Sequence, residues 1–189
     1  MRITGGRARG IPLVSPRGDA VRPATDAMRQ AVFSSLAARV PGASFLDLFA
    51  GSGAYGLEAF SRGAVGGVFV EKDARTAACI RQNIAAVAKS LGRGAGDLRV
   101  INADATGVPV AALPDLVFVD PPYDLIPAVA PKLFARLAEL RVAGVDPLVV
   151  FEMPGELTLS PEGWTCVKRL GKGVHQPTVA IFRLDQASP

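Results

Sequence analysis

Residues 120–123 combine a carboxylate, a stiff turn and an aromatic ring directly after an apolar run, 116–119. The two prolines have no N–H, so nearby backbone carbonyls are not absorbed into a helix or ladder and remain available as acceptors. Two acceptors beside a ring suit the exocyclic amine of a nucleobase, which has two donors at the edge of a π-face. A rigid turn with a satisfied aspartate fits the same tetrapeptide. The four residues are Asp120, Pro121, Pro122 and Tyr123.

A glycine-rich turn, residues 50–56, follows a second apolar run, 44–49, and leads into a helix-like segment. Glycines there allow positive φ and close approach of a ligand, and a helix N-terminus offers unpaired N–H groups. Glu71 ends the next apolar run. It lies roughly 20 residues beyond the glycine turn, as does the carboxylate that binds ribose hydroxyls in nucleotide-binding folds. This arrangement predicts a nucleoside site.

Two cofactor classes compete for this turn. Gly51, Gly53 and Gly56 have the spacing of the dinucleotide fingerprint, so a nicotinamide cofactor must be considered. Asp47 favours S-adenosylmethionine, because a carboxylate just before the turn repels a pyrophosphate and suits ammonium and sulfonium charges. Asp104 follows a third strand-like run, 98–101, and can accept from an adenine amino group. We expect these acids to face one nucleoside, although each alone also fits a solvated loop carboxylate or a helix cap.

The composition predicts one domain with a small appendage, since 189 residues with 49% hydrophobic content can bury a full core. No apolar run approaches the roughly 20 residues of a membrane span, and arginines and glycines occupy the place of a signal-peptide core. We therefore expect a cytoplasmic protein. Cys79 and Cys166 lack metal-like spacing and are expected to be buried reduced thiols. His175 is the only histidine, which excludes histidine triads and multi-histidine metal sites.

Arginines gather near the start of the chain, where residues 1–29 hold six arginines and two aspartates. Guanidinium groups pair bidentately with phosphates and stack on bases, which favours an RNA or DNA partner over a merely soluble surface. Short β-like pieces, 2–4 and 11–14, predict a hairpin-like extension that leans on the main domain or becomes ordered on nucleic acid. The six arginines are Arg2, Arg7, Arg9, Arg17, Arg22 and Arg29.

The remaining pattern predicts a doubly wound α/β domain. A helix capped by Thr25 or Asp26 and running to Val40 comes first, with Arg29 and Arg39 off its buried stripe. Two β-like runs close the chain, and an antiparallel pair on a parallel sheet is typical of methyltransferases and unusual for nicotinamide dehydrogenases. Counting these two closing runs, strands are expected at 44–49, 67–71, 98–101, 116–119, 148–152, 164–170 and 178–184. Besides the first helix, helices are expected up to about 62 and at 73–90 and 127–140.

With these residues in view, the chain resembles, almost end to end, the bacterial small-subunit ribosomal RNA guanine-N2 methyltransferases of the RsmD type. The glycine turn and residues 120–123 are shared by many amino-methyltransferases, whereas the Arg-Pro-x-Thr-Asp block at 22–26 is more selective. The chain departs from the family pattern at Ala24, Ala27 and Gln30. The matching motifs lie in residues 2–10, 16–18, 22–29, 46–53, 58–64, 70–71 and 120–123.

The resemblance implies a Rossmann-like class I methyltransferase fold. This fold has a mainly parallel seven-stranded sheet, a C-terminal antiparallel hairpin and a small N-terminal β-hairpin extension. It implies residues 1–22 as a basic RNA-contacting extension and residues 23–189 as the methyltransferase domain. It also implies methyl transfer from S-adenosylmethionine to the N2 amine of a guanine in 16S rRNA. The substrate would be free rRNA or a 30S assembly particle, and the enzyme a monomer that needs no metal.

The resemblance and the residues together assign roles. The Asp120 carboxylate and the Pro121 carbonyl would hold the two amine hydrogens while Tyr123 stacks on an extruded guanine. Whether Asp120 takes the proton or water does is left open. Phosphate contacts are expected from Arg7, Arg9, Arg17 and Arg22. Cofactor contacts are expected from Asp47, Phe49, Ala50, Gly51, Gly53, Glu71, Lys72, Asp104, Ala105, Thr25 and Arg29.

Other readings stay open at this point. Thr25 and Arg29 also fit a helix cap and a surface arginine. An amino-methyltransferase acting on DNA adenine or cytosine would use the same tetrapeptide. An RNA-binding assembly factor that holds the cofactor without transferring methyl, and a dehydrogenase, are the remaining alternatives.

Overall fold

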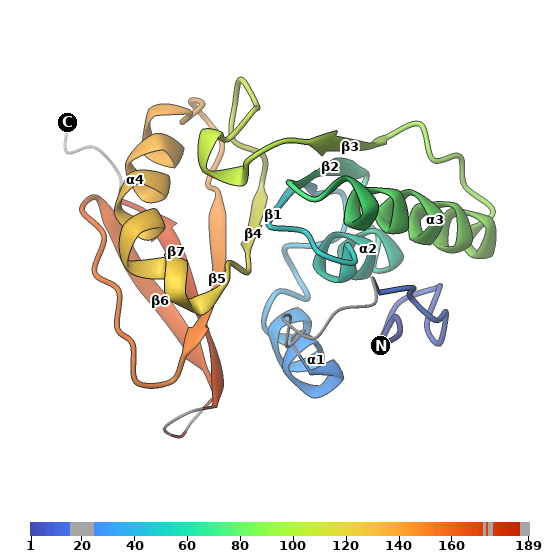
Figure 1. Ribbon diagram of the computed structural model, residues 1–189, viewed down its shortest axis with the longest axis horizontal. Coiled ribbons are helices and arrows are strands. Elements are labelled where there is room, and N and C mark those ends of the chain that lie inside the picture. Colours follow the sequence, from blue (N-terminus) through green and yellow to red (C-terminus); the bar gives the residue numbers. More distant parts are fainter. Residues whose placement is uncertain (16–24, 172, 174–175, 186–189) are drawn as a thin grey trace.

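The computed structural model describes residues 1–15, 25–171, 173 and 176–185 (Figure 1). Its centre is a seven-stranded sheet in the order β3-β2-β1-β4-β5-β7-β6. The first five strands of this order are parallel, while β7 is antiparallel to β5 and β6 is antiparallel to β7. The predicted Rossmann-like class I methyltransferase fold is therefore confirmed. The strands are β1 (Ser44–Leu48), β2 (Gly66–Glu71), β3 (Leu98–Asn102), β4 (Leu116–Val119), β5 (Leu148–Pro154), β6 (Trp164–Leu170) and β7 (Pro177–Leu184).

Helices cover both faces of the sheet. The first three helices pack in one hydrophobic core and the last helix packs in a second one, so the domain has three layers (Figure 1). Two 3-10 turns follow the ends of β3 and β4. The helices are α1 (Asp26–Ser35), α2 (Ala54–Ser61), α3 (Ala74–Leu91) and α4 (Ile126–Glu139), and the turns are η1 (Ala105–Gly107) and η2 (Tyr123–Leu125).

The strand order reverses between β1 and β4. From β1 the chain winds outward through β2 to β3, then returns to place β4 on the other side of β1. Ligands of open α/β sheets bind at the carboxyl ends of the strands beside such a reversal. The end of β1 leads into the glycine turn and the end of β4 leads into Asp120, so both predicted motifs lie at this point.

Side chains of β1 alternate between the two cores, as strand geometry requires. Leu46 and Leu48 pack in the core that contains α4, and Phe45 packs in the core that contains the first three helices. Asp47 is two residues beyond Phe45, so it lies on the same face of the strand, and it is only 2% exposed. The fold therefore places a carboxyl group inside an apolar layer, where ionisation is costly.

The N-terminal segment, residues 1–15, leans on the main domain. Its expected hairpin is reduced to a single antiparallel bridge between Arg2 and Pro12, and Pro12 has no N–H with which to extend a ladder. Ile3 and Ala8 are buried in the core beside α2. The backbone N–H of Ala8 donates to Ser61 Oγ on that helix at 2.9 Å. The described part of the extension thus shares the main hydrophobic core.

Two expectations about the first helix are wrong. The α-helix ends at Ser35, not at Val40, because Leu36 adopts φ −97° and ψ 8° and the chain continues in turns. Leu36 and Val40 are still buried, so a spacing of four residues persists without a helix. Arg29 is 0% exposed and does not lie on the surface. Its Nη2 donates to the Arg2 carbonyl and to Asp26 Oδ1 at 2.6 and 2.7 Å, and these partners permit its burial.

The cysteine expectation is half correct. Cys79 and Cys166 are both free thiols, but Cys166 is exposed on the edge strand β6 and Cys79 is only partly buried. Residues 165–169 of β6 are all exposed, so the alternating burial that would hide Cys166 is absent. His175, Arg17 and Arg22 lie outside the described residues. In the described ranges, no helix is long and apolar enough to cross a membrane.

Gly56 sets how closely α2 approaches the sheet, which generates a test. A Cβ at this position would lie 2.4 Å from Phe69 Cε1 and 2.5 Å from Phe45 Cε2. Overpacking of this kind costs about 1–3 kcal/mol, against about 1 kcal/mol gained from helix propensity. Because both contacts are shorter than 3.0 Å, we expect the upper end of that cost, so Gly56→Ala should lower the free energy of unfolding in urea by roughly 2 kcal/mol. Gly94→Ala is the matched control, since nothing lies within 4 Å of its Cβ position. Equal stabilities for the two variants would contradict this packing.

Candidate active site

The glycine turn is built from left-handed backbone. Phe49, Gly51 and Gly53 have φ values of 57°, 55° and 77°. Such values suit glycine and are uncommon for a residue such as phenylalanine, so the turn is a locally strained segment. Gly53 is the N-cap of α2 and has no side chain with which to cap it. The buried Ala50 closes the turn by accepting from the Gly53 N–H at 2.7 Å. The turn therefore lies directly after the carboxyl end of β1 and leads into α2.

Glu71 lies against this turn, as its sequence distance predicts. Its Oε2 accepts from the Gly51 N–H at 2.9 Å, and its Oε1 accepts from the Asp73 N–H at 2.8 Å. The side chain is half-buried at the end of β2. A carboxylate oxygen can accept more than one hydrogen bond, so both oxygens retain capacity for a ligand hydroxyl. The structure thus places the expected ribose-binding group beside the glycines.

Asp104 lies at the end of the neighbouring strand β3 and caps η1. Its Oδ1 accepts from the backbone N–H and hydroxyl of Thr106, at 2.9 and 2.6 Å. Lys72 Nζ lies 3.4 Å from its Oδ2. The Thr106 hydrogen bonds and Lys72 lower the pKa of Asp104. Both charged side chains are exposed, whereas Ala105 is buried, so Asp104 offers an ionised acceptor at the rim of the site.

Asp47 anchors β1 to the start of α2. Its Oδ2 accepts from the Gly56 N–H at 2.9 Å. Burial raises the pKa of Asp47 to about 8, the Gly56 hydrogen bond opposes this shift, and the negative charge of Glu71 adds to it. At neutral pH without a cation, the site therefore favours a protonated Asp47. A bound positive charge would favour its ionised form.

The tetrapeptide at the end of β4 forms the opposite side of the site. Asp120 is half-buried and Pro121 is buried, while Pro122 and Tyr123 are exposed. Tyr123 is 38% exposed, so part of its side chain is accessible from solvent. Burial, followed by the negative charges of Glu152 and Asp47, raises the pKa of Asp120 well above its usual range. The charge of Glu71 thus acts on Asp47, and the charge of Asp47 acts on Asp120. Because β2, β1 and β4 are neighbours in the sheet, the two motifs lie at the same edge.

Other expected contacts have structural roles in this chain. Thr25 caps α1 by accepting from the Met28 N–H at 3.2 Å. Arg29 is fully buried, and its partners include the Arg2 carbonyl and Asp26. Arg7 and Arg9 are exposed on the N-terminal segment. The hydrogen bond of Thr25 is therefore that of a helix cap.

Sequence reasoning missed two residues of the site. Glu152 on β5 is 1% exposed, and the Tyr55 hydroxyl on α2 donates to its Oε2 at 2.9 Å. Burial raises the pKa of Glu152 to about 7, whereas the Tyr55 hydrogen bond and the charge of Arg29 lower it. Glu152 follows a buried apolar run, as the other acids of the site do. That shared pattern was the signal that could have identified it.

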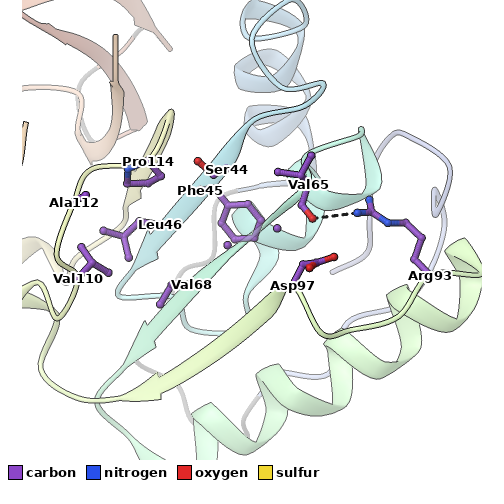
Figure 2. Close-up of a pocket in the computed structure, with 12 residues that line it drawn as sticks. Ser44, Phe45, Leu46, Val65, Val68, Arg93, Asp97, Val110, Ala112 and Pro114 are labelled. Carbon is purple, nitrogen blue, oxygen red and sulfur yellow. Dashed lines mark hydrogen bonds between the residues drawn. The ribbon is translucent and has the colours of Figure 1, made fainter. Parts of the chain in front are cut away.

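One hollow in the structure lies away from these residues. It has a volume of about 560 Å³ and is bordered by the starts of β1 and β2 at the amino edge of the sheet. Figure 2 shows it lined by apolar side chains such as Val110 and Pro114, with Arg93 donating to the Val65 carbonyl at 3.1 Å. It offers no carboxylate pair for an amine. Across the described ranges, no three His, Cys, Asp or Glu side chains are grouped to hold a metal ion.

Comparison with known proteins agrees with this geometry. The Ribosomal RNA small subunit methyltransferase D of Escherichia coli K12 is 40% identical over 129 residues, which cover 65% of this chain and 60% of that relative. The protein of the same name from Haemophilus influenzae Rd is 29% identical over 181 residues, covering 92% of this chain and 90% of the relative. The solved structure of Escherichia coli yhhF superposes with a TM-score of 0.81 at 31% identity, covering 99% of each chain.

A family model extends the match to nearly the whole chain. Residues 1–181 match the model described as Conserved hypothetical protein 95. The matched span includes the N-terminal segment, the glycine turn and the tetrapeptide at 120–123. The chain therefore belongs to the Conserved hypothetical protein 95 family, and its resemblance to RsmD-type methyltransferases is confirmed.

Proposed function

We propose that this protein transfers a methyl group from S-adenosylmethionine to the N2 amine of a guanine in 16S rRNA. The RsmD-type resemblance implies guanine 966 as the position. The observation that supports the proposal is the strand register, which brings Asp47, Glu71 and Asp120 near the carboxyl ends of the neighbouring strands β1, β2 and β4. Acceptors for a ribose, for a cationic methyl donor and for a base amine then lie at one edge of the sheet. The protein acts as a monomer on free rRNA or on a 30S assembly particle.

The cofactor is held by complementary charge and hydrogen bonding. Glu71 accepts from the ribose hydroxyls while it continues to hold the Gly51 N–H. Asp104 accepts from the adenine amino group, and the N–H groups at the start of α2 face the amino-acid carboxylate. Asp47 lies nearest the ammonium and sulfonium charges, which favour its ionised form. Phe49, Ala50, Lys72 and Ala105 border the same cofactor site.

The chain activates the amine by geometry. The N2 lone pair of guanine is delocalised into the ring, so the amine is a poor nucleophile until its hydrogens are held out of plane. The Asp120 carboxylate and the Pro121 carbonyl accept these two hydrogens and aim the lone pair. Tyr123 stacks on the extruded base. Bound S-adenosylmethionine supplies an electrophilic methyl group on an activated leaving group, so the reaction requires no metal.

Small-subunit rRNA is proposed because of two independent features. Two curated relatives are named for methylation of the small-subunit ribosomal RNA. Arg7 and Arg9 lie exposed on the N-terminal segment and carry no ion pair within the described ranges. Residues 1–22 would then act as a basic RNA-contacting extension of the methyltransferase domain at 23–189. Phosphate pairing by arginine supplies affinity, and the active-site tetrapeptide supplies base choice.

Methyl transfer is tested with labelled S-adenosylmethionine on unmodified 16S rRNA, on 30S particles and on DNA. We expect N2-methylguanosine in RNA by mass spectrometry of the nucleosides. Asp120→Ala should reduce turnover by roughly 10²–10⁴-fold with cofactor affinity retained, because it removes an acceptor that acts on the reacting amine. Asp124→Ala, which changes an exposed neighbour, is the control and should retain turnover. Methylation of DNA alone, or full turnover by Asp120→Ala, would refute the proposal.

Asp47 should make both stability and cofactor binding depend on pH. Its pKa is raised from 3.8 to about 8 in the folded chain, so its contribution to stability is full below pH 3.8 and is lost as pH rises through 8. Asp47→Asn keeps an acceptor for Gly56 and abolishes this loss. We expect it to raise the free energy of unfolding at pH 8.5 by on the order of 1 kcal/mol or more, relative to the change at pH 5.

The same variant should weaken S-adenosylmethionine binding at pH 8 by roughly tenfold, because a cation loses its carboxylate partner. Binding of S-adenosylhomocysteine, which lacks the sulfonium charge, should weaken less. Urea unfolding and calorimetric titration measure the two effects. If wild type and variant show parallel stabilities from pH 5 to pH 8.5, Asp47 does not titrate as described.

Arg7 and Arg9 should contribute to RNA affinity and should not affect S-adenosylmethionine affinity. Replacing Arg7 and Arg9 by alanine removes two exposed cations, so the slope of log affinity against log salt should decrease by about 1–2. S-adenosylmethionine affinity should stay the same. A matched double replacement of Arg136 and Arg141, at the end of α4 on the other face of the sheet, should change neither quantity. Filter binding across a salt series measures this, and an unaltered slope in the Arg7/Arg9 variant would exclude their phosphate contact.

A further inference from the structure

Strand register brings a second carboxyl group against Asp120. Val119 on β4 pairs with Phe151 on β5, so the next step of the register places Asp120 opposite Glu152. Side chains alternate along each strand, and the preceding residues of the same parity, Phe118 and Val150, both pack in the core with the first three helices. Asp120 and Glu152 therefore project toward the same layer from neighbouring strands.

Glu152 is held in place by α2, which packs in the layer toward which Glu152 projects. The Tyr55 hydroxyl donates to Glu152 Oε2 at 2.9 Å. The Tyr55 ring stacks on Phe118, with centroids 5.4 Å apart and planes 17° from parallel, which fixes the direction of that hydroxyl. Glu152 is 1% exposed, so it does not reach the surface bordered by Tyr123. A substrate that contacts Asp120 therefore does not contact Glu152.

Charged and titratable groups surround this pair from every packed element. Asp47 faces Asp120 from β1, and Tyr55 faces both acids from α2. Arg29 on α1 faces Glu152 and Tyr55, and lowers the pKa of each. With an ionised Glu152 beside it, Asp120 holds a proton more strongly than an isolated aspartate, since adjacent buried carboxylates do not readily ionise together.

We propose that Glu152 is a positioning residue for Asp120, and that Asp120, with Glu152 behind it, accepts the proton released by the methylated amine. The inference rests on the proposed methyl transfer and deepens it, because it assigns the base. The nitrogen–carbon bond forms as the carbon–sulfur bond breaks, and the electron pair of that bond stays on sulfur. The amine proton passes to the Asp120 carboxylate and then to water.

This arrangement suits the change in charge during the reaction. Before transfer, the negative charge of Asp120 is balanced by the positive sulfonium. After transfer the sulfur is neutral and Asp120 carries the proton, so a pair of opposite charges in a partly buried site has disappeared. An ionised Glu152 at a fixed distance opposes the charged form of Asp120 once the cation is gone, and so favours the protonated product. Tyr55 keeps Glu152 in the position where it can exert this effect.

The test is the pH profile of turnover in Glu152→Gln. Glutamine has the size of glutamate and still accepts from Tyr55, so the variant removes charge with little change in shape. In the plot of kcat against pH, we expect the rising limb to move roughly one pH unit lower, because Asp120 ionises more easily. The plateau of kcat should be lowered about tenfold, and the affinity for S-adenosylmethionine should be retained. Tyr55→Phe keeps the ring stack and removes the donor, so its limb should move in the same direction by less.

A buried carboxyl elsewhere separates this effect from structural damage. Glu58 is 0% exposed and accepts from Thr4 and Arg62, so Glu58→Gln should lower the melting temperature and leave the limb in place. If Glu152→Gln also lowers only the melting temperature and its limb does not move, Glu152 is structural and the proposal is overturned.

A second readout does not depend on RNA. Infrared titration of the carboxyl stretch in the free protein, assigned with Asp120→Asn, should show Asp120 losing its proton at lower pH in Glu152→Gln. An unmoved Asp120 titration overturns the coupling. Absence of methyl transfer by the wild-type protein would refute the proposed function, and the infrared titration would still decide whether Glu152 acts on Asp120.

Discussion

Carboxyl groups held out of water at the carboxyl edge of the sheet are the constraint that organises this protein. Parallel register delivers Asp47, Asp120 and Glu152 to one layer on neighbouring strands. Each would be costly without partners. The Gly56 N–H binds Asp47, the Tyr55 hydroxyl binds Glu152, and a cationic methyl donor would complete the balance beside Asp120. A positive ligand would favour the ionised forms of these carboxyl groups, so the site suits a cation.

The same layer explains why an arginine is buried there. Arg29 places a guanidinium group at 0% exposure, with Asp26 and the Arg2 carbonyl as partners and Glu58 Oε2 at 4.0 Å from its Nε. Its charge also lowers the pKa of Glu152. Arg29 thus connects the N-terminal segment to the acids behind the tetrapeptide. Arg29, for which the sequence predicts a cofactor contact, also acts on Glu152 through its charge.

A second connection joins the N-terminal segment to the glycine turn. Asn83 on α3 is 1% exposed, and its Nδ2 donates to the Val14 carbonyl at 2.8 Å and to the Ser52 carbonyl at 2.9 Å. Its Oδ1 accepts from the Val14 N–H at 2.8 Å. One amide side chain therefore holds both the segment that presents Arg7 and Arg9 and the turn that would hold the cofactor.

Local patterns predicted most of the strands and helices, because alternation, glycine turns and caps depend on neighbours in the chain. The helix expected at 73–90 is an example, since α3 spans Ala74–Leu91. The burial of Arg29 and the Tyr55–Glu152 hydrogen bond were not predicted, because they depend on which strands and helices become neighbours. The exposure of Cys166 was missed for the same reason, since an edge strand has the same local pattern as a covered one.

A crystal structure with bound S-adenosylhomocysteine tests the central claim most directly. The account predicts that the ribose hydroxyls lie within hydrogen-bonding distance of Glu71 and that the sulfur faces Asp120 and Pro121 across the β1/β4 reversal. A nucleoside bound in the hollow at the amino edge of the sheet, or at the carboxyl edge without a Glu71 contact, would contradict it.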